Sequence, residues 1–160
     1  MNQRIKLSVE LHKFNEYLTL KALGELDSEH LYERPLDRCN SFYWVIGHIV
    51  WTRYELAKAL GLEETLPGGD LFEIGAEIRD PEVYPPFEEL TAAYTDICAK
   101  LNTKFEVLTD AELDGTPPFK IPGIEESIAG IVSFLSFHES YHVGQLAYIL
   151  RIHGGKQLVG

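Results

Sequence analysis

Residues 128–149 read IAGIVSFLSFHESYHVGQLAYI, and this stretch decides the predicted fold. Its apolar residues recur at steps of three and four positions, which is the spacing of one face of an α-helix. The inward face consists of Ile128, Ile131, Leu135, His138, His142, Leu146 and Ile149. We predict one helix from about Glu125 to His153, ended by the glycine pair that follows. Two histidines therefore replace aliphatic residues in the middle of a buried stripe.

The same periodicity predicts three more helices, over about Ser8–Leu26, Asn40–Leu60 and Phe87–Leu108. The inward stripe of the first is Leu11, Phe14, Leu18 and Ala22, and that of the third is Leu90, Tyr94, Ile97, Leu101, Phe105 and Leu108. Residues 62–85 are rich in proline and glycine, so we expect a long connection with at most short helical turns. These features predict an all-α protein, a four-helix bundle with long crossover connections, as a single domain over residues 1–160.

The composition is that of an acidic globular chain. Its 160 residues include 14 Lys and Arg against 25 Asp and Glu, a net charge of -11, which disfavours binding to nucleic acid or to an anionic membrane. No apolar run reaches the roughly 18 residues of a membrane span. The two cysteines, Cys39 and Cys98, are too few for a disulfide framework, and residues 1–12 lack the apolar core of a signal peptide. We therefore expect a cytoplasmic protein without a nucleic-acid or membrane partner.

Three histidines occupy apolar positions of the predicted helices. His138 and His142 are four residues apart, so both imidazoles lie on one helix face and can reach one ion. His48 lies in FYWVIGHIVW (residues 42–51), the most apolar stretch of the chain, and Gly47 beside it indicates a close approach of a neighbouring helix. Burying imidazoles is costly unless their nitrogens find partners. The partner is either a shared metal ion or, for each histidine separately, a hydrogen bond to a neighbour.

Two known metal motifs fit the chain poorly. Residues 138–142, HESYH, have the H-E-x-x-H pattern of zinc proteases, which requires a third ligand further along the chain. No Asp or Glu follows His142, and Tyr148 stands where one protease class has its third histidine. A di-iron carboxylate bundle requires two Glu-x-x-His units within its helices, and we find only Glu139 with His142.

The remaining interpretation is one divalent ion held by His48, His138 and His142. Three neutral imidazoles leave coordination positions open, which is typical of catalytic rather than structural zinc sites. Such an ion lowers the pKa of bound water to about 7 and deprotonates a bound thiol. Glu139 is a candidate catalytic residue that touches bound water or orients a ligand, with a surface ion pair as the alternative. Gln145, one turn after His142, is a candidate hydrogen-bond partner for the site.

Four segments carry a family likeness: SFYWVIGHI (41–49), PFEELTAAY (86–94), LTDAELD (108–114) and FHESYHVGQLAYI (137–149). With them the chain resembles the DinB-like family of metal-binding four-helix bundles. The resemblance implies an up-down-down-up bundle with a zinc or nickel ion bound by one histidine of the second helix and two of the fourth. It also implies a homodimer, and the apolar start of the second helix agrees with burial against a partner subunit.

The resemblance further implies a function. Relatives in this family include S-transferases and isomerases that use bacillithiol, mycothiol or glutathione. We therefore expect a metal-dependent thiol S-transferase acting on a small electrophile, because a metal-bound thiolate forms at neutral pH. The alternatives are a hydrolase that uses metal-bound water, with Glu139 as a possible base, and a non-catalytic metal-binding bundle of a stress response. We expect the connection 62–85 to form the pocket mouth that determines which thiol cofactor reacts with the small-molecule substrate.

Overall fold

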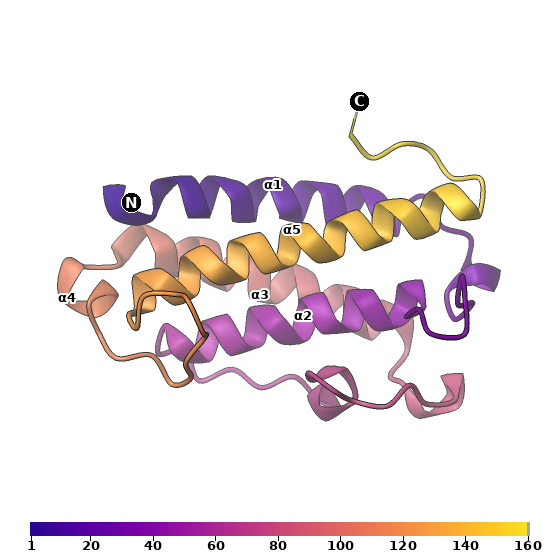
Figure 1. The fold of residues 1–160 in the computed structure, drawn as a ribbon, viewed down its shortest axis with the longest axis horizontal. Helices are drawn as coiled ribbons and strands as arrows, with labels where there is room; N and C mark the ends of the chain where they lie inside the picture. The colour runs from indigo at the N-terminus through magenta and orange to yellow at the C-terminus, as the bar shows by residue number, and fades with distance from the viewer. Residues whose placement is uncertain (160) are drawn as a thin grey trace.

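The computed structural model describes residues 1–159, and these residues form helices without a β-strand (Figure 1). The long helices are α1 (Lys6–Leu23), α2 (Phe42–Ala59), α3 (Phe87–Val107) and α5 (Ile128–Ile152), and the short α4 (Asp110–Leu113) follows α3. The 3₁₀ helices are η1 (Gln3–Ile5), η2 (Ser28–His30), η3 (Gly69–Phe72) and η4 (Pro81–Val83). The all-α prediction is confirmed, and residues 62–85 form a long connection that contains only the short helical turns η3 and η4.

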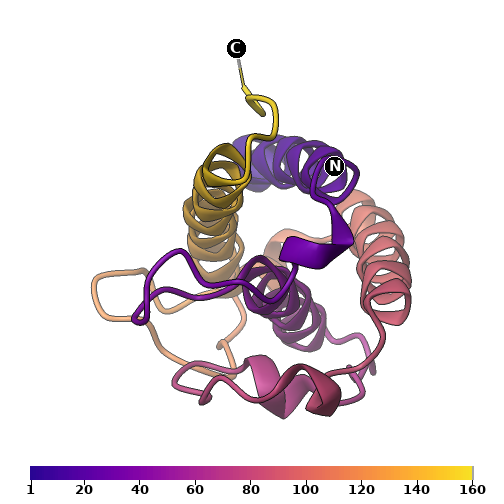
Figure 2. The same cartoon turned by 90° about the vertical axis from the view of Figure 1, so that its right-hand side faces the viewer.

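The bundle has the predicted up-down-down-up order. Helices α1 and α5 run in one direction, and α2 and α3 run in the other (Figure 1). Seen end-on, α5 lies between α1 and α2, and α3 lies beside α2 (Figure 2). Because α2 and α3 are parallel neighbours, the connection between them has to travel the length of the bundle. None of the helices within residues 1–159 combines the length and the apolar character needed to cross a lipid bilayer.

Capping moves the start of α5. The apolar periodicity predicts a start near Glu125, whereas the helix begins at Ile128. Ser127 is the reason, because its hydroxyl accepts a hydrogen bond of 3.1 Å from a backbone N–H of the first turn. The C-terminus of α1 also differs from the prediction, because this helix ends at Leu23 and not at Leu26. Periodicity therefore identifies each helix, and local capping sets its bounds.

The buried face of α1 differs from the predicted stripe. Leu18 is buried as expected, but Phe14 is 48% exposed. The face turned toward the core instead includes the polar residues His12 and Asn15. The side chain of Asn15 donates a hydrogen bond of 3.0 Å to the backbone carbonyl of Ser136 on α5, which compensates for the burial of its amide. A pattern of apolar residues alone cannot reveal such a face.

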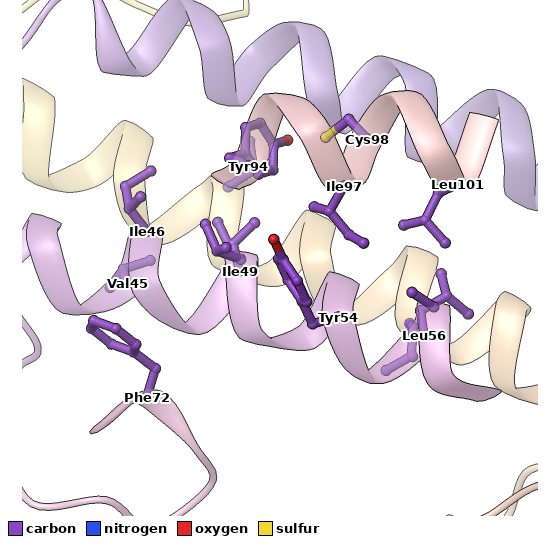
Figure 3. Close-up of a cluster of buried hydrophobic side chains, with 14 of the residues drawn as sticks. Val45, Ile46, Ile49, Tyr54, Leu56, Phe72, Tyr94, Ile97, Cys98 and Leu101 are labelled. Carbon is purple, nitrogen blue, oxygen red and sulfur yellow. The ribbon is translucent and has the colours of Figure 1, made fainter. Parts of the chain in front are cut away.

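Helix α2 is covered on two sides by its own chain. Ile97 and Leu101 of α3 point toward it from one side, and Phe72 of η3 lies on the other (Figure 3). A Cβ atom at Gly47 would overlap the ring of Phe72. This glycine therefore allows the connection 62–85, rather than one of the long helices, to pack closely against α2. The apolar start of α2 therefore requires no partner subunit, and the homodimer stays a prediction.

A buried ion pair joins the helices inside the bundle. Arg53 of α2 and Glu139 of α5 are each 2% exposed, and Nε of Arg53 donates to both carboxylate oxygens at 3.1 Å. Nη2 of Arg53 also donates to the backbone carbonyl of His12 on α1, and the Tyr94 hydroxyl of α3 donates to Glu139. Burial, the largest single cause, raises the pKa of Glu139, but the charges and hydrogen bonds of Arg53 and His12 together outweigh it and hold that pKa below its ordinary value.

Replacing Arg53 by Met is expected to lower the free energy of unfolding by about 3–5 kcal/mol, because Glu139 then keeps a buried charge without a partner. Urea denaturation followed by circular dichroism measures the loss. The double variant Arg53→Met/Glu139→Leu should recover much of it, since both charges are removed. The control Lys6→Met breaks an exposed pair with Glu10 and should leave the midpoint almost unchanged. An equally small effect of Arg53→Met would contradict the importance of the buried pair.

Candidate metal centre

Three histidines from two helices converge inside the bundle. His48 comes from α2, His138 and His142 come from successive turns of α5, and one potential ligand nitrogen from each lies within 4.8 Å of the other two. His48 and His142 are 3% and 7% exposed, whereas His138 is half-buried. The structure thus brings together the three histidines that the sequence indicates, and the cluster opens to solvent on the side of His138.

Aromatic neighbours hold the three rings in place. The imidazoles meet edge to face, with angles of 63–71° between their planes. Trp44 and Trp51 lie over the ring of His48 with centroids 5.1 and 5.4 Å away. Phe134 stacks on His138 with a centroid distance of 5.6 Å. This packing restricts the rotation of each ring and preorganises the cluster.

Hydrogen bonds fix the tautomers of two of the histidines. Nδ1 of His48 lies 2.6 Å from the backbone carbonyl oxygen of Phe72, and Nδ1 of His142 lies 2.8 Å from Oε1 of Gln145. Both oxygens can only accept, so each Nδ1 carries the proton and each Nε2 keeps its lone pair. Gln145 is the partner that its position after His142 predicts. The contact with Phe72 is not predicted, because a hydrogen bond to a backbone carbonyl leaves no signal in the sequence. Only Gly47 indicates that another part of the chain approaches α2 closely at this point.

The spacing of the ring nitrogens fits a shared cation. Nε2 of His138 lies 3.2 Å from Nε2 of His142. Two nitrogens that each lie about 2 Å from one zinc ion are separated by roughly this distance. In the absence of an ion, the same distance requires Nε2 of His138 to donate a hydrogen bond to His142. The His138–His142 pair therefore fits a shared divalent ion.

Burial keeps the imidazoles neutral near pH 7. It lowers the pKa of His142 to about 4, although the hydrogen bond to Gln145 acts in the opposite direction. Burial is also the main cause that lowers the pKa values of His48 and His138. A neutral imidazole is the form that binds a metal ion, so no proton has to leave the cluster at neutral pH before a metal ion binds.

Glu139 belongs to the interior ion pair. Both of its carboxylate oxygens accept hydrogen bonds from Arg53, and Oε2 also lies 3.3 Å from Nδ1 of His12. The alternative predicted from the sequence is a surface ion pair. Glu139 does form an ion pair, with Arg53, but the pair is buried. A contact with a ligand in the cluster would require the carboxylate to leave Arg53. The catalytic role of Glu139 stays a prediction.

Two cavities lie along α5, and one of them adjoins the histidine cluster. One, of about 510 Å³, has His138 in its wall and is bounded on the outside by Ile74 and residues 119–122. The other, of about 630 Å³, includes Gln145 and is bounded by residues of the connection between α1 and α2. The connection 62–85 thus contributes Ile74 to the first cavity, but much of the outer wall comes from residues 119–122, whose role the sequence does not predict.

A second group of potential ligands, His30, Glu33 and His153, lies where the connection after α1 meets the end of α5. The rings of His30 and His153 stack 4.4 Å apart with planes at 21°, unlike the inclined rings of the first cluster. Glu33 lies 3.1 Å from Nδ1 of His30 and 3.6 Å from Nδ1 of His153, distances that contacts between imidazole and carboxylate explain. We assign no metal ion to this group.

The fold and the cluster define a class of protein: an up-down-down-up four-helix bundle with a candidate three-histidine metal centre between α2 and α5. The model of the DinB superfamily matches residues 12–146, a range that includes all three histidines. The chain therefore belongs to the DinB superfamily, as its sequence motifs indicate. No curated protein matches the chain at a significant level.

Solved structures share the fold over nearly the whole chain. A DinB-like protein from Bacillus cereus is 19% identical, with a TM-score of 0.69 over 98% of this chain and 97% of that chain. The DinB-like protein YjoA from Bacillus subtilis is 18% identical, with a TM-score of 0.63 over 99% and 97%. YfiT from Bacillus subtilis, described as a probable metal-dependent hydrolase with an unusual four-helix bundle topology, is 14% identical, with a TM-score of 0.65 over 98% and 91%. At these identities the likeness establishes the fold alone.

The hydrogen bonds to Phe72 and Gln145 predict that His48 and His142 carry their protons on Nδ1 in the metal-free protein. Imidazole ¹⁵N NMR spectra measure this directly. Gln145→Leu should release His142 from the Nδ1–H form and leave His48 unchanged, because the bond to Phe72 persists. Gln157→Leu changes an exposed glutamine and serves as the control. An Nε2–H tautomer at either histidine in the unmodified protein would refute the assignment.

Proposed function

We propose that this protein is a divalent-metal-dependent enzyme whose ion is held by His48, His138 and His142. The observation that carries the proposal is the convergence of one nitrogen from each of the three within 4.8 Å, in a buried and aromatic surrounding. Membership of the DinB superfamily, and the description of the structurally similar YfiT as a probable metal-dependent hydrolase, support it. Zinc and nickel are the favoured ions through the family resemblance, and imidazole suits both.

The chain's own residues prepare the site for this chemistry. When bound, the ion acts as a Lewis acid that lowers the pKa of a water or thiol ligand. The carbonyl of Phe72 and the side chain of Gln145 hold His48 and His142 in the tautomer that leaves Nε2 free. Trp44 and Trp51 shield His48 from water, and half-buried His138 leaves an approach for a small molecule.

We favour a thiol S-transferase that joins a low-molecular-weight thiol, such as bacillithiol, mycothiol or glutathione, to a small electrophile. A hydrolase with Glu139 as its base requires a free carboxylate, and both oxygens of Glu139 are bound to Arg53. A thiol that coordinates a metal ion is deprotonated without such a base. A metal-dependent hydrolase is the second candidate, favoured by the description of YfiT. The homodimer belongs to the proposal through the family resemblance, and the cytoplasmic location belongs to it through the composition of the chain.

Protein loaded with zinc and then dialysed is expected to retain about one ion per chain by elemental analysis. His48→Ala and His138→Ala should each lose the ion, because two imidazoles remain. His30→Ala is the matched control and should retain the ion, since His30 belongs to the other histidine group. Retention of zinc by both ligand variants, or its loss from the control, would show that the ligands lie elsewhere.

Zinc- or nickel-loaded protein should accelerate the loss of free thiol when bacillithiol or glutathione is mixed with monobromobimane. His138→Ala should reduce the rate to that of the uncatalysed mixture, and a metal chelator should do the same to the unmodified protein. Fluorescence of the bimane adduct measures the rate. Hydrolysis of p-nitrophenyl acetate without added thiol, lost in the same variant, would favour the hydrolase. If neither reaction depends on the metal, both enzymatic assignments fail for these substrates.

A further inference from the structure

The cavity of about 510 Å³ beside His138 has a largely apolar wall. It lies between α2, α5 and the connection that precedes α5, and its apolar lining includes Trp51, Ile74, Phe119, Ile121, Phe134 and Leu135. The side chain of Ile74 at the edge of this cavity is 79% exposed. The volume is within the usual range of pockets for small molecules.

The cavity is continuous with the histidine cluster. His138 forms part of its wall, and this histidine is the half-buried member of the three. Phe134, which stacks on the ring of His138, lines the same cavity. A molecule that fills the cavity therefore lies against the open side of the site, where the remaining coordination positions of an ion would be.

The polar groups at the rim are already paired. Glu55 forms an ion pair with Lys58, and Lys120 forms one with Glu126. The hydroxyl of Thr52 donates to the backbone carbonyl of His48 at 2.7 Å. The cavity thus offers a bound molecule apolar area but no unpaired charge, which selects an uncharged and apolar group.

We propose that this cavity binds the apolar part, aromatic or aliphatic, of a small uncharged substrate whose reactive group faces the histidine cluster. This inference rests on the proposed function and specifies its substrate class. The cavity next to Gln145 differs, because Arg38 and Asn40 are among its lining residues and none of the three histidines is.

Alkyl hydroxamates test the inference, because their head group binds the metal ion and their tail reports on the cavity. The dissociation constants of acetohydroxamate, butanohydroxamate and hexanohydroxamate are measured by calorimetry on zinc-loaded and metal-free protein. Each methylene group that enters the cavity should tighten binding by up to about fourfold, which is the fold-change for burying one such group. The binding of acetohydroxamate by itself tests only the metal ion.

Substitutions in the wall of the cavity show where the alkyl tail of the hydroxamate binds. Phe119→Ser and Ile74→Ser each remove apolar wall without changing a residue that contacts the histidines, and Ile74 is exposed enough that its variant should fold. In the unmodified protein hexanohydroxamate should bind more tightly than acetohydroxamate. Both variants should reduce this difference in affinity by severalfold and leave the dissociation constant of acetohydroxamate unchanged. The matched control is Phe137→Ser, which removes a 65% exposed ring from α5 and should change neither constant.

The outcomes separate the inference from the proposed function. Equal affinities along the series, with binding that still requires zinc, overturn the apolar substrate site and leave the metal site intact. A tail effect that persists in both wall variants also overturns it, because the tail then binds elsewhere. If no hydroxamate binds in a zinc-dependent way, the proposed function fails and the inference fails with it. A tail effect that requires zinc and weakens in both wall variants supports the inference.

Discussion

The ion pair between Arg53 and Glu139 sets the register of α2 against α5, and the histidine cluster depends on that register. His138 directly precedes Glu139 on α5, and His48 precedes Arg53 on α2 by little more than one turn. A slip of one turn moves a helix by about 5.4 Å, which would separate both the charges and the imidazoles. Each uncompensated buried charge would cost several kcal/mol, so the ion pair opposes such a slip. The bundle therefore holds the site through a contact that is not part of it.

The fold was largely predictable because long helices carry strong periodicity. The stripe of α5 from Ile128 to Ile149 is buried except for half-buried His138, and Ser41 caps α2 at the predicted place. The face of α1 was not predictable in the same way. Its buried side includes His12 and Asn15, whose burial depends on partners in α2 and α5 that only the folded chain supplies. The homodimer, the cellular location and the division into domains are questions that the fold of one chain leaves as predictions.

The candidate site was predictable to the extent that its residues interrupt apolar stripes. His48, His138 and His142 stand out for this reason. Arg53 interrupts the inward face of α2 between Ile49 and Leu56 in the same manner, so the rule that finds the histidines could also have found the ion pair. The contact of His48 with the carbonyl of Phe72 and the cavity wall formed by residues 119–122 could not be predicted from the sequence. Their positions follow from the path of long connections, whose conformation has no periodic signal.

Charge balance relates the ion pair to the chemistry proposed for the site. Three neutral imidazoles would leave the full charge of a divalent ion in a largely buried and aromatic surrounding, where an uncompensated charge is costly. Glu139 is the carboxylate nearest to the histidines in sequence, but Arg53 already neutralises it. The compensating negative charge then has to come from a molecule that enters through the open side of His138. A thiol that loses its proton on binding supplies that charge, whereas an uncharged substrate in the apolar cavity beside His138 does not. The same ion pair that holds α2 against α5 thus leaves the site in need of an external anion.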